Sequence, residues 1–88
     1  MEIVNGGVQE QTKQVMENLK AVLEEASSSF ENVLKTTCYL SDMDNFVAFN
    51  EIYGEYFNAQ TAPARSTVAV KTLPKNVLVE VDVIAFKN

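Results

Sequence analysis

The last strand-forming stretch, from Val77 to Phe86, constrains the fold more than any other feature of the sequence. Apolar residues recur there at every second position, a period that predicts a β-strand with one continuous apolar face: Val77, Val79, Val81, Val83 and Ala85. The opposite face carries Glu80 and Asp82 among apolar neighbours. Because one apolar face of a sheet has to be buried against a second layer, the rest of the chain must supply that layer.

Two stretches with helical spacing are suited to cover the strand. Apolar residues separated by three or four positions predict one amphipathic helix from Val8 to Ala26 and a second from Met43 to Asn58. Ser41 and Asp42 precede the second helix as a candidate N-cap. Five of the eight aromatic residues fall in this second helix, and we interpret them as core side chains rather than as a ligand-stacking surface.

Two further strands complete the expected sheet. Val33 to Leu40 alternates with period two, and this alternation places four side chains on one face: Leu34, Thr36, Cys38 and Leu40. A loop over Asn58 to Ala64 leads to the next strand, Arg65 to Lys71. The order is helix, strand, helix, strand, strand. It predicts an α+β fold in which both helices pack on one face of a three-stranded sheet.

Composition excludes several classes of function. A chain of 88 residues makes one small domain, residues 1–88, whose thin core favours self-association. Twelve acidic and seven basic residues give a net charge of −5, which disfavours a nucleic-acid surface. The sequence contains no histidine and only one cysteine, so a Cys/His zinc site or a histidine-activated nucleophile within one chain is excluded.

Neither a targeting signal nor a membrane span is evident in the sequence. The first residues lack a basic region followed by an apolar one, and no window approaches about 18 consecutive apolar residues. We therefore expect a cytoplasmic protein without membrane partners.

Three polar residues could carry chemistry. Arg65 follows the Pro63 turn, so it could present a guanidinium in a fixed direction to a carboxylate, or it could be an ordinary solvated arginine. Glu80 is a candidate for proton transfer if its strand face is buried, and a surface charge if that face is open. Thr67 shares a strand face with Arg65 and could hold a water molecule, although threonine is common in strands.

Two other polar residues are expected to be structural. Cys38 lies in an apolar alternation, which is typical of a small buried side chain rather than a reactive thiol. Asn50 lies midway along the aromatic helix and is expected to bond a nearby backbone group.

The segments around these residues resemble a known family. The chain is similar to the Rid (YjgF) family of reactive-intermediate imine deaminases in three segments: Pro63–Val68, Leu73–Lys75 and Val79–Val81. Weaker similarity extends over most of the chain, including Asn18–Glu24, Val33–Thr37 and Asn50–Tyr53.

The resemblance implies a fold, an assembly and an activity. Members have a chorismate-mutase-like α+β fold and form homotrimers with ligand sites in clefts between subunits. Active members hydrolyse 2-imino acids or their enamine tautomers to 2-oxo acids and ammonia, and need no metal or organic cofactor. By position, Arg65 would clamp the substrate carboxylate, and Glu80 would activate water or shuttle its proton. Thr67 stands where many members have cysteine, so only its backbone would contact the ligand.

The chain departs from the family pattern at two places. Members begin with a β-hairpin, of which only Glu2–Val4 could be a remnant here, so the sheet would be left with an open edge. Ser27 stands where members usually have the glycine that ends the first helix, and we expect this substitution to cost a little stability.

Three hypotheses therefore remain. The chain could be an imine deaminase or a shortened form of one, with Arg65 and Glu80 as its catalytic residues. It could instead be a non-catalytic member that captures small carboxylates at Arg65 and regulates a partner. Third, it could be an inactive fragment that acts only as a folding module.

Overall fold

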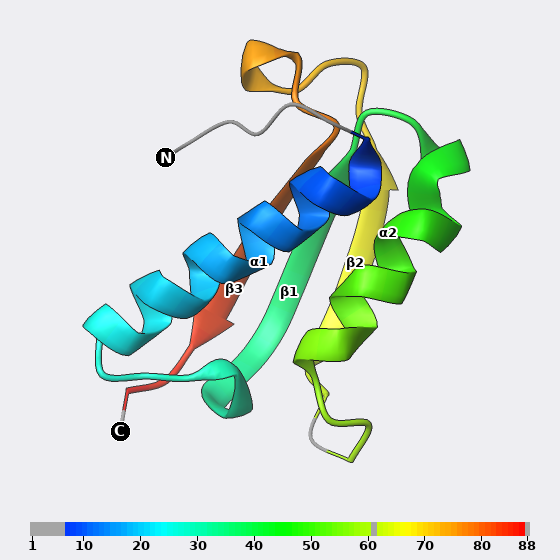
Figure 1. Ribbon diagram of the computed structural model, residues 1–88. Helices are drawn as coiled ribbons and strands as arrows, with labels where there is room; N and C mark the ends of the chain where they lie inside the picture. Colours follow the sequence, from blue (N-terminus) through cyan, green and yellow to red (C-terminus); the bar gives the residue numbers. More distant parts are fainter. Residues whose placement is uncertain (1–6, 61, 88) are drawn as a thin grey trace.

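The computed structural model describes residues 7–60 and 62–87 as two helices packed on one face of a three-stranded sheet (Figure 1). The helices are α1, Val8–Glu25, and α2, Phe46–Tyr53. The strands are β1, Val33–Leu40, β2, Ala64–Ala69, and β3, Val79–Ala85. The predicted α+β architecture is confirmed, whereas the expected hairpin remnant at Glu2–Val4 lies outside the described residues.

The strand order is β2-β1-β3, with β1 parallel to β2 and antiparallel to β3. β1 is therefore the central strand. Helix α2 connects the two parallel strands, and a parallel connection needs such a crossover to return the chain to the same end of the sheet.

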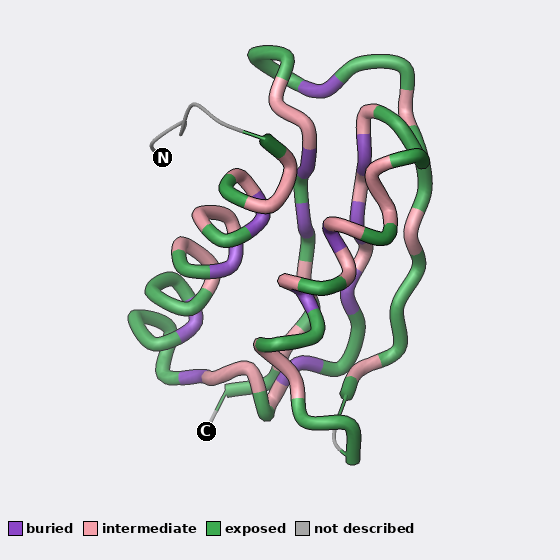
Figure 2. Tube along the Cα trace, turned by 45° about the vertical axis from the view of Figure 1, so that its right-hand side comes forward, coloured by how far each residue is buried: buried purple, intermediate pink, exposed green. Residues whose placement is uncertain are grey.

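The core lies between the helices and the sheet. Buried residues alternate along β1 and β3 and recur on the inner faces of the helices (Figure 2). One cluster joins both layers: Met16, Cys38, Leu40, Phe49, Tyr53, Val79 and Val81. Phe46, Tyr56 and Phe57 pack partly buried against it, which agrees with the interpretation of the aromatic residues as core.

Two expectations about local structure are wrong. Leu34 does not share the buried face of β1: a register shift between Val33 and Lys35 gives the buried position to Val33 and leaves Leu34 57% exposed. The second helix is also less regular than a continuous helix over Met43 to Asn58, because short 3₁₀ turns flank α2 on both sides. Asp42 caps the first of these turns by accepting a hydrogen bond from the Asp44 backbone N–H, at 2.9 Å.

The last turn of α1 is followed by a residue with a left-handed backbone. Ser27 has a φ of 61°, in the left-handed region. Its N–H bonds the carbonyl of Glu24 at 3.0 Å, and the N–H of Ser28 bonds that of Leu23 at 2.7 Å. This pair of bonds is a Schellman motif, in which the left-handed residue is normally glycine because it has no Cβ.

We expect Ser27→Gly to raise the free energy of unfolding by about 0.5–1 kcal/mol. Glycine removes the strain of the left-handed backbone, but it also increases the conformational entropy of the unfolded chain, which offsets part of the stabilisation. Urea denaturation at an unchanged m-value measures the difference. Ser29→Gly is the control because Ser29 is extended, with a φ of −161°. A gain that is equal or larger at Ser29 would contradict the explanation.

A hydrogen bond with a pH-dependent consequence joins α1 to the 3₁₀ turn that follows α2. The Tyr56 hydroxyl donates to Glu17 Oε2 at 2.7 Å. Burial, followed by this bond to Glu17, raises the pKa of Tyr56 from 10.0 to about 12.

Stability should consequently fall between pH 10 and pH 12, where the unfolded phenol loses its proton before the folded one. Below pH 10 both forms are protonated, so the contribution of Tyr56 is complete there. Denaturation midpoints of wild type and Tyr56→Phe, measured across this range, test the assignment: the variant should show the shallower decline. Equal slopes would exclude Tyr56 as the group responsible.

Candidate functional site

Register within the sheet decides which face each predicted site residue occupies. Neighbouring residues on paired strands point to the same face. Arg65 pairs with Thr36 and Thr67 with Cys38, and both partners are buried beneath the helices. Arg65 and Thr67 therefore lie on the helix-covered face, as their shared alternation predicted.

Glu80 lies on the opposite face of the sheet. It pairs with Tyr39, which lies between the buried residues Cys38 and Leu40 in the alternation of β1 and so points away from the helices. Glu80 is exposed, so its face of the sheet is open within a single chain. One chain thus does not bring Arg65 and Glu80 together, since β1 and the thickness of the sheet separate them.

The guanidinium of Arg65 is held from two directions. Its Nη1 donates a hydrogen bond to Asn50 Oδ1 of α2. Its Cζ lies 5.4 Å from the ring centroid of Phe46 and 4.7 Å from that of Tyr53, within the range of cation–π attraction. Arg65 is still exposed, so a fixed cationic fork faces outward at the edge of β2.

The support for Arg65 extends into the core. The Tyr53 hydroxyl is hydrogen-bonded to Thr36 Oγ1 at 2.7 Å, and both residues are buried. This bond fixes the ring on which Arg65 stacks. The buried layer therefore holds the orientation of the exposed cation.

Phe46, Asn50 and Tyr53 are site residues whose role the sequence-based reasoning missed. Asn50 was expected to bond backbone, but it bonds the Arg65 side chain instead. The sequence did contain an indication of this role: Phe46, Asn50 and Tyr53 are separated by four and three positions, which places them on one face of a helix. What the sequence did not reveal is that β2 lies beneath that face.

Cys38 is a buried free thiol beside this network. Burial raises its pKa, and the opposing effects of the Arg65 charge and the Thr36 and Thr67 side chains are smaller. Burial likewise raises the pKa of Tyr53. A protonated thiol is a poor nucleophile, so the prediction that Cys38 is a small structural side chain agrees with its surroundings.

Across residues 7–60 and 62–87, no group of three or more Cys, Asp and Glu side chains is placed to hold a metal ion. Within the same ranges, neither helix is long and apolar enough to cross a membrane.

The sequence and the fold of this chain match a known family. Residues 1–87 match the sequence model of the family described as Endoribonuclease L-PSP. A RutC family protein of Pyrococcus abyssi is 52% identical over 87 residues, which are 99% of this chain and 68% of that protein. A RutC family protein of Synechocystis sp. is 59% identical over 80 residues, which are 91% of this chain and 62% of that protein.

Solved structures agree with this assignment. Yeast Mmf1 has a TM-score of 0.92 at 42% identity, over 97% of this chain and 67% of that one. E. coli TdcF, crystallised with bound serine, has a TM-score of 0.87 at 34% identity, over 97% of this chain and 68% of that one. The chain belongs to the Endoribonuclease L-PSP family, whose members also carry the names Rid, YjgF and RutC. It spans about two thirds of the length of these relatives.

The network beneath Arg65 yields a stability prediction. Tyr53→Phe removes the partner of a buried hydroxyl and should cost about 1–3 kcal/mol. Thr36→Val in the Tyr53→Phe background should add less than it costs alone, because the hydroxyl that was left unpaired is then gone. A double-mutant cycle from urea denaturation measures this coupling, and strictly additive effects would show that the two hydroxyls do not interact.

Proposed function

We propose that this chain forms the site of a Rid-type deaminase, which hydrolyses 2-imino acids or their enamine tautomers to 2-oxo acids and ammonia. The observation that carries the proposal is the fixed, exposed guanidinium of Arg65. No Asp or Glu forms an ion pair with it within residues 7–60 and 62–87. A planar cationic fork without a protein counter-ion is suited to bind the carboxylate of an imino acid bidentately.

The proposed mechanism uses one acid and one cation. Arg65 holds the substrate carboxylate and so places the imine carbon. Glu80 accepts a proton from a water molecule as its oxygen attacks that carbon, and passes the proton to nitrogen. The carbinolamine that results then releases ammonia and leaves the 2-oxo acid. Thr67 lies beside Arg65 on β2 and is proposed to line the site through its backbone.

Two chains are needed to bring these residues together. Arg65 and Glu80 lie on opposite faces of the sheet in one chain. A cleft that contains both residues must therefore combine Arg65 of one chain with Glu80 of a neighbouring chain. We propose a homotrimer with three such inter-subunit clefts. Support comes from apolar side chains left exposed on or beside the strands: Leu34, Val68, Ile84 and Phe86. Exposed apolar surface of this kind favours association.

The activity is tested with 2-iminopropanoate or 2-iminobutanoate generated in situ, by following ammonia and 2-oxo acid. Arg65→Lys should raise KM about tenfold or more, because lysine cannot make the bidentate contact. Glu80→Gln should lower kcat about 100-fold or more with KM little changed. Glu31→Gln, at an exposed carboxylate of the turn before β1, is the control and should retain the wild-type rate.

Release of ammonia and 2-oxo acid no faster than in buffer without protein would exclude deaminase activity. So would wild-type rates in both Arg65→Lys and Glu80→Gln. Sedimentation should show the mass of three chains, and a monomer would exclude the shared cleft.

A second candidate is a carboxylate-binding regulator without turnover. It is favoured by the separation of the two residues, since a chain that holds Arg65 without Glu80 beside it has the binding half of the site only. A Lactococcus lactis relative, 51% identical over 84 residues, is described as a candidate regulator. Calorimetry with 2-oxobutanoate distinguishes the two: binding that requires Arg65, without imine hydrolysis, would favour the regulator.

A further inference from the structure

The side-chain amide of Asn50 has its orientation set by Arg65. A guanidinium carries N–H donors and no acceptor, so the amide atom that faces Arg65 Nη1 has to be the oxygen, Oδ1. The nitrogen, Nδ2, lies at the other end of the amide and donates to no acceptor in the described part of the chain. Asn50 is half-buried, and its Nδ2 is not among the buried polar atoms. This N–H₂ group is therefore a donor that a ligand can reach.

Local helix structure does not account for asparagine at this position. Asn50 lies inside α2, where asparagine is less favourable than alanine, leucine or glutamine because its side chain competes for backbone hydrogen bonds. Its side chain makes no such backbone bond here and holds Arg65 instead. The contact with Arg65 is thus the reason to look for at position 50.

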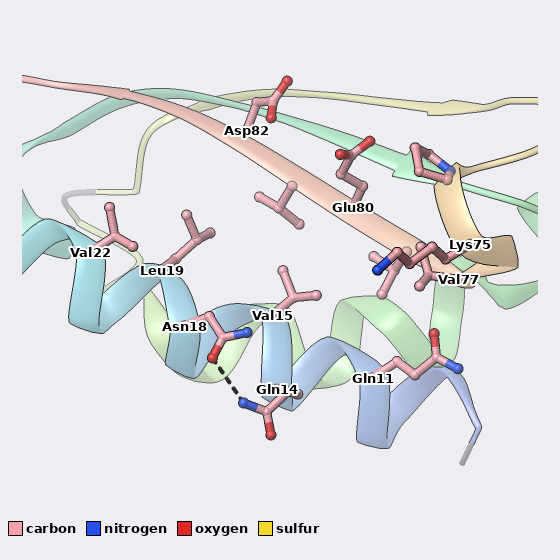
Figure 3. Close-up of a pocket in the computed structure, with 13 residues that line it drawn as sticks. Gln11, Gln14, Val15, Asn18, Leu19, Val22, Lys75, Val77, Glu80 and Asp82 are labelled. Atoms are coloured by element: carbon pink, nitrogen blue, oxygen red, sulfur yellow. Dashed lines mark hydrogen bonds between the residues drawn. The ribbon is translucent and has the colours of Figure 1, made fainter. Parts of the chain in front are cut away.

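The amide holds Arg65 without neutralising it. Aspartate would accept the same hydrogen bond, but its charge would pair with the guanidinium and compete with an anionic ligand. The carboxylates of β3 lie elsewhere in the chain. Glu80 and Asp82 line a cavity of about 410 Å³ between α1 and β3, and neither Arg65 nor Asn50 lines it (Figure 3). The positive charge of Arg65 thus stays available to a carboxylate ligand.

Two aromatic rings restrict how such a ligand approaches. The Arg65 Cζ lies over the rings of Phe46 and Tyr53, at 5.4 and 4.7 Å from their centroids. The N–H donors lie in the guanidinium plane, so a carboxylate binds along an edge rather than over a face. The hydrogen bond to Asn50 Oδ1 also runs along this plane. The amide therefore stands beside the place where the carboxylate binds.

We propose that Asn50 is a second carboxylate-binding residue of the Arg65 site. Its Oδ1 holds the guanidinium, and its Nδ2 donates a further hydrogen bond to the carboxylate that Arg65 binds. The inference rests on the proposed binding of a 2-imino or 2-oxo acid at Arg65, and it does not depend on hydrolysis of that acid.

Calorimetry of the full chain with 2-oxobutanoate measures the effect on Kd. Asn50→Asp keeps the shape of the side chain and the acceptor for Arg65, but it removes the donor and adds a negative charge. We expect it to weaken binding about 100-fold or more. Asn50→Ala removes donor and acceptor without adding charge, and should weaken binding about tenfold. A residue that served only to hold Arg65 would give the opposite order.

Asn58→Asp is the matched control. Asn58 is exposed in the loop that follows α2, and its Oδ1 accepts a hydrogen bond from the Gln60 backbone N–H at 2.8 Å, which aspartate retains. The substitution changes the net charge of the chain as Asn50→Asp does. Its Kd should stay within about twofold of the wild-type value, because an exposed charge acts weakly through solvent. Circular dichroism checks that each variant keeps the wild-type helix content.

NMR of the side-chain amides separates a binding residue from one that only positions Arg65. The two Nδ2 proton signals of Asn50 are assigned by their loss in Asn50→Ala. Addition of 2-oxobutanoate to the wild-type chain should move them downfield as the hydrogen bond forms, together with the guanidinium signals of Arg65. Movement of the Arg65 signals alone would mean that Asn50 does not touch the ligand.

Three results would overturn the inference. The first is Asn50→Asp binding as tightly as Asn50→Ala or the Asn58 control. The second is bound 2-oxobutanoate that leaves the Asn50 amide signals unmoved. The third is a wild-type chain that binds no 2-oxobutanoate, which would also remove the proposed carboxylate site. Binding without imine hydrolysis would reject the deaminase alone, and the role of Asn50 would stand.

Discussion

The pairing of β1 with both of its neighbours is the constraint on which the other features depend. Its parallel register with β2 places Arg65 beside Thr36, under α2, and its antiparallel register with β3 places Glu80 beside Tyr39 on the open face. A shift of one residue in either pairing would exchange the faces. The register therefore determines both the support of the cation and its separation from the carboxylate.

Much of the fold could be predicted from the sequence because its periods are strong. The alternation of β3 and the helical spacing of α1 define their inner faces with little ambiguity. Leu34 was misassigned because a bulge changes the period for one residue, and nothing in an alternating run reveals where a bulge occurs. Ser27 was recognised as a departure from the family pattern, and its left-handed backbone gives the physical reason.

The candidate site was predictable only in part. The positions of Arg65 and Thr67 on one strand face followed from alternation, but the contacts of Arg65 with Asn50 and two aromatic rings depend on how α2 crosses β2. Tertiary packing of this kind leaves no pattern in the local sequence. Whether the face of Glu80 is buried or open to solvent could not be decided for a similar reason. A mixed run of acidic and apolar residues is compatible with both.

No strand within residues 7–60 and 62–87 pairs with the outer edge of β3, and this has a consequence for handling the protein. An unpaired strand beside apolar side chains is a template for aggregation. Acidic side chains along such an edge oppose it, because they repel the same edge of another copy. Glu80 and Asp82 have this effect whatever else they do. Salt screens surface charges over a distance of about 10 Å at 0.1 M ionic strength. Concentrated solutions should therefore aggregate least at low ionic strength, where the acidic edges of different copies repel one another over the longest distance.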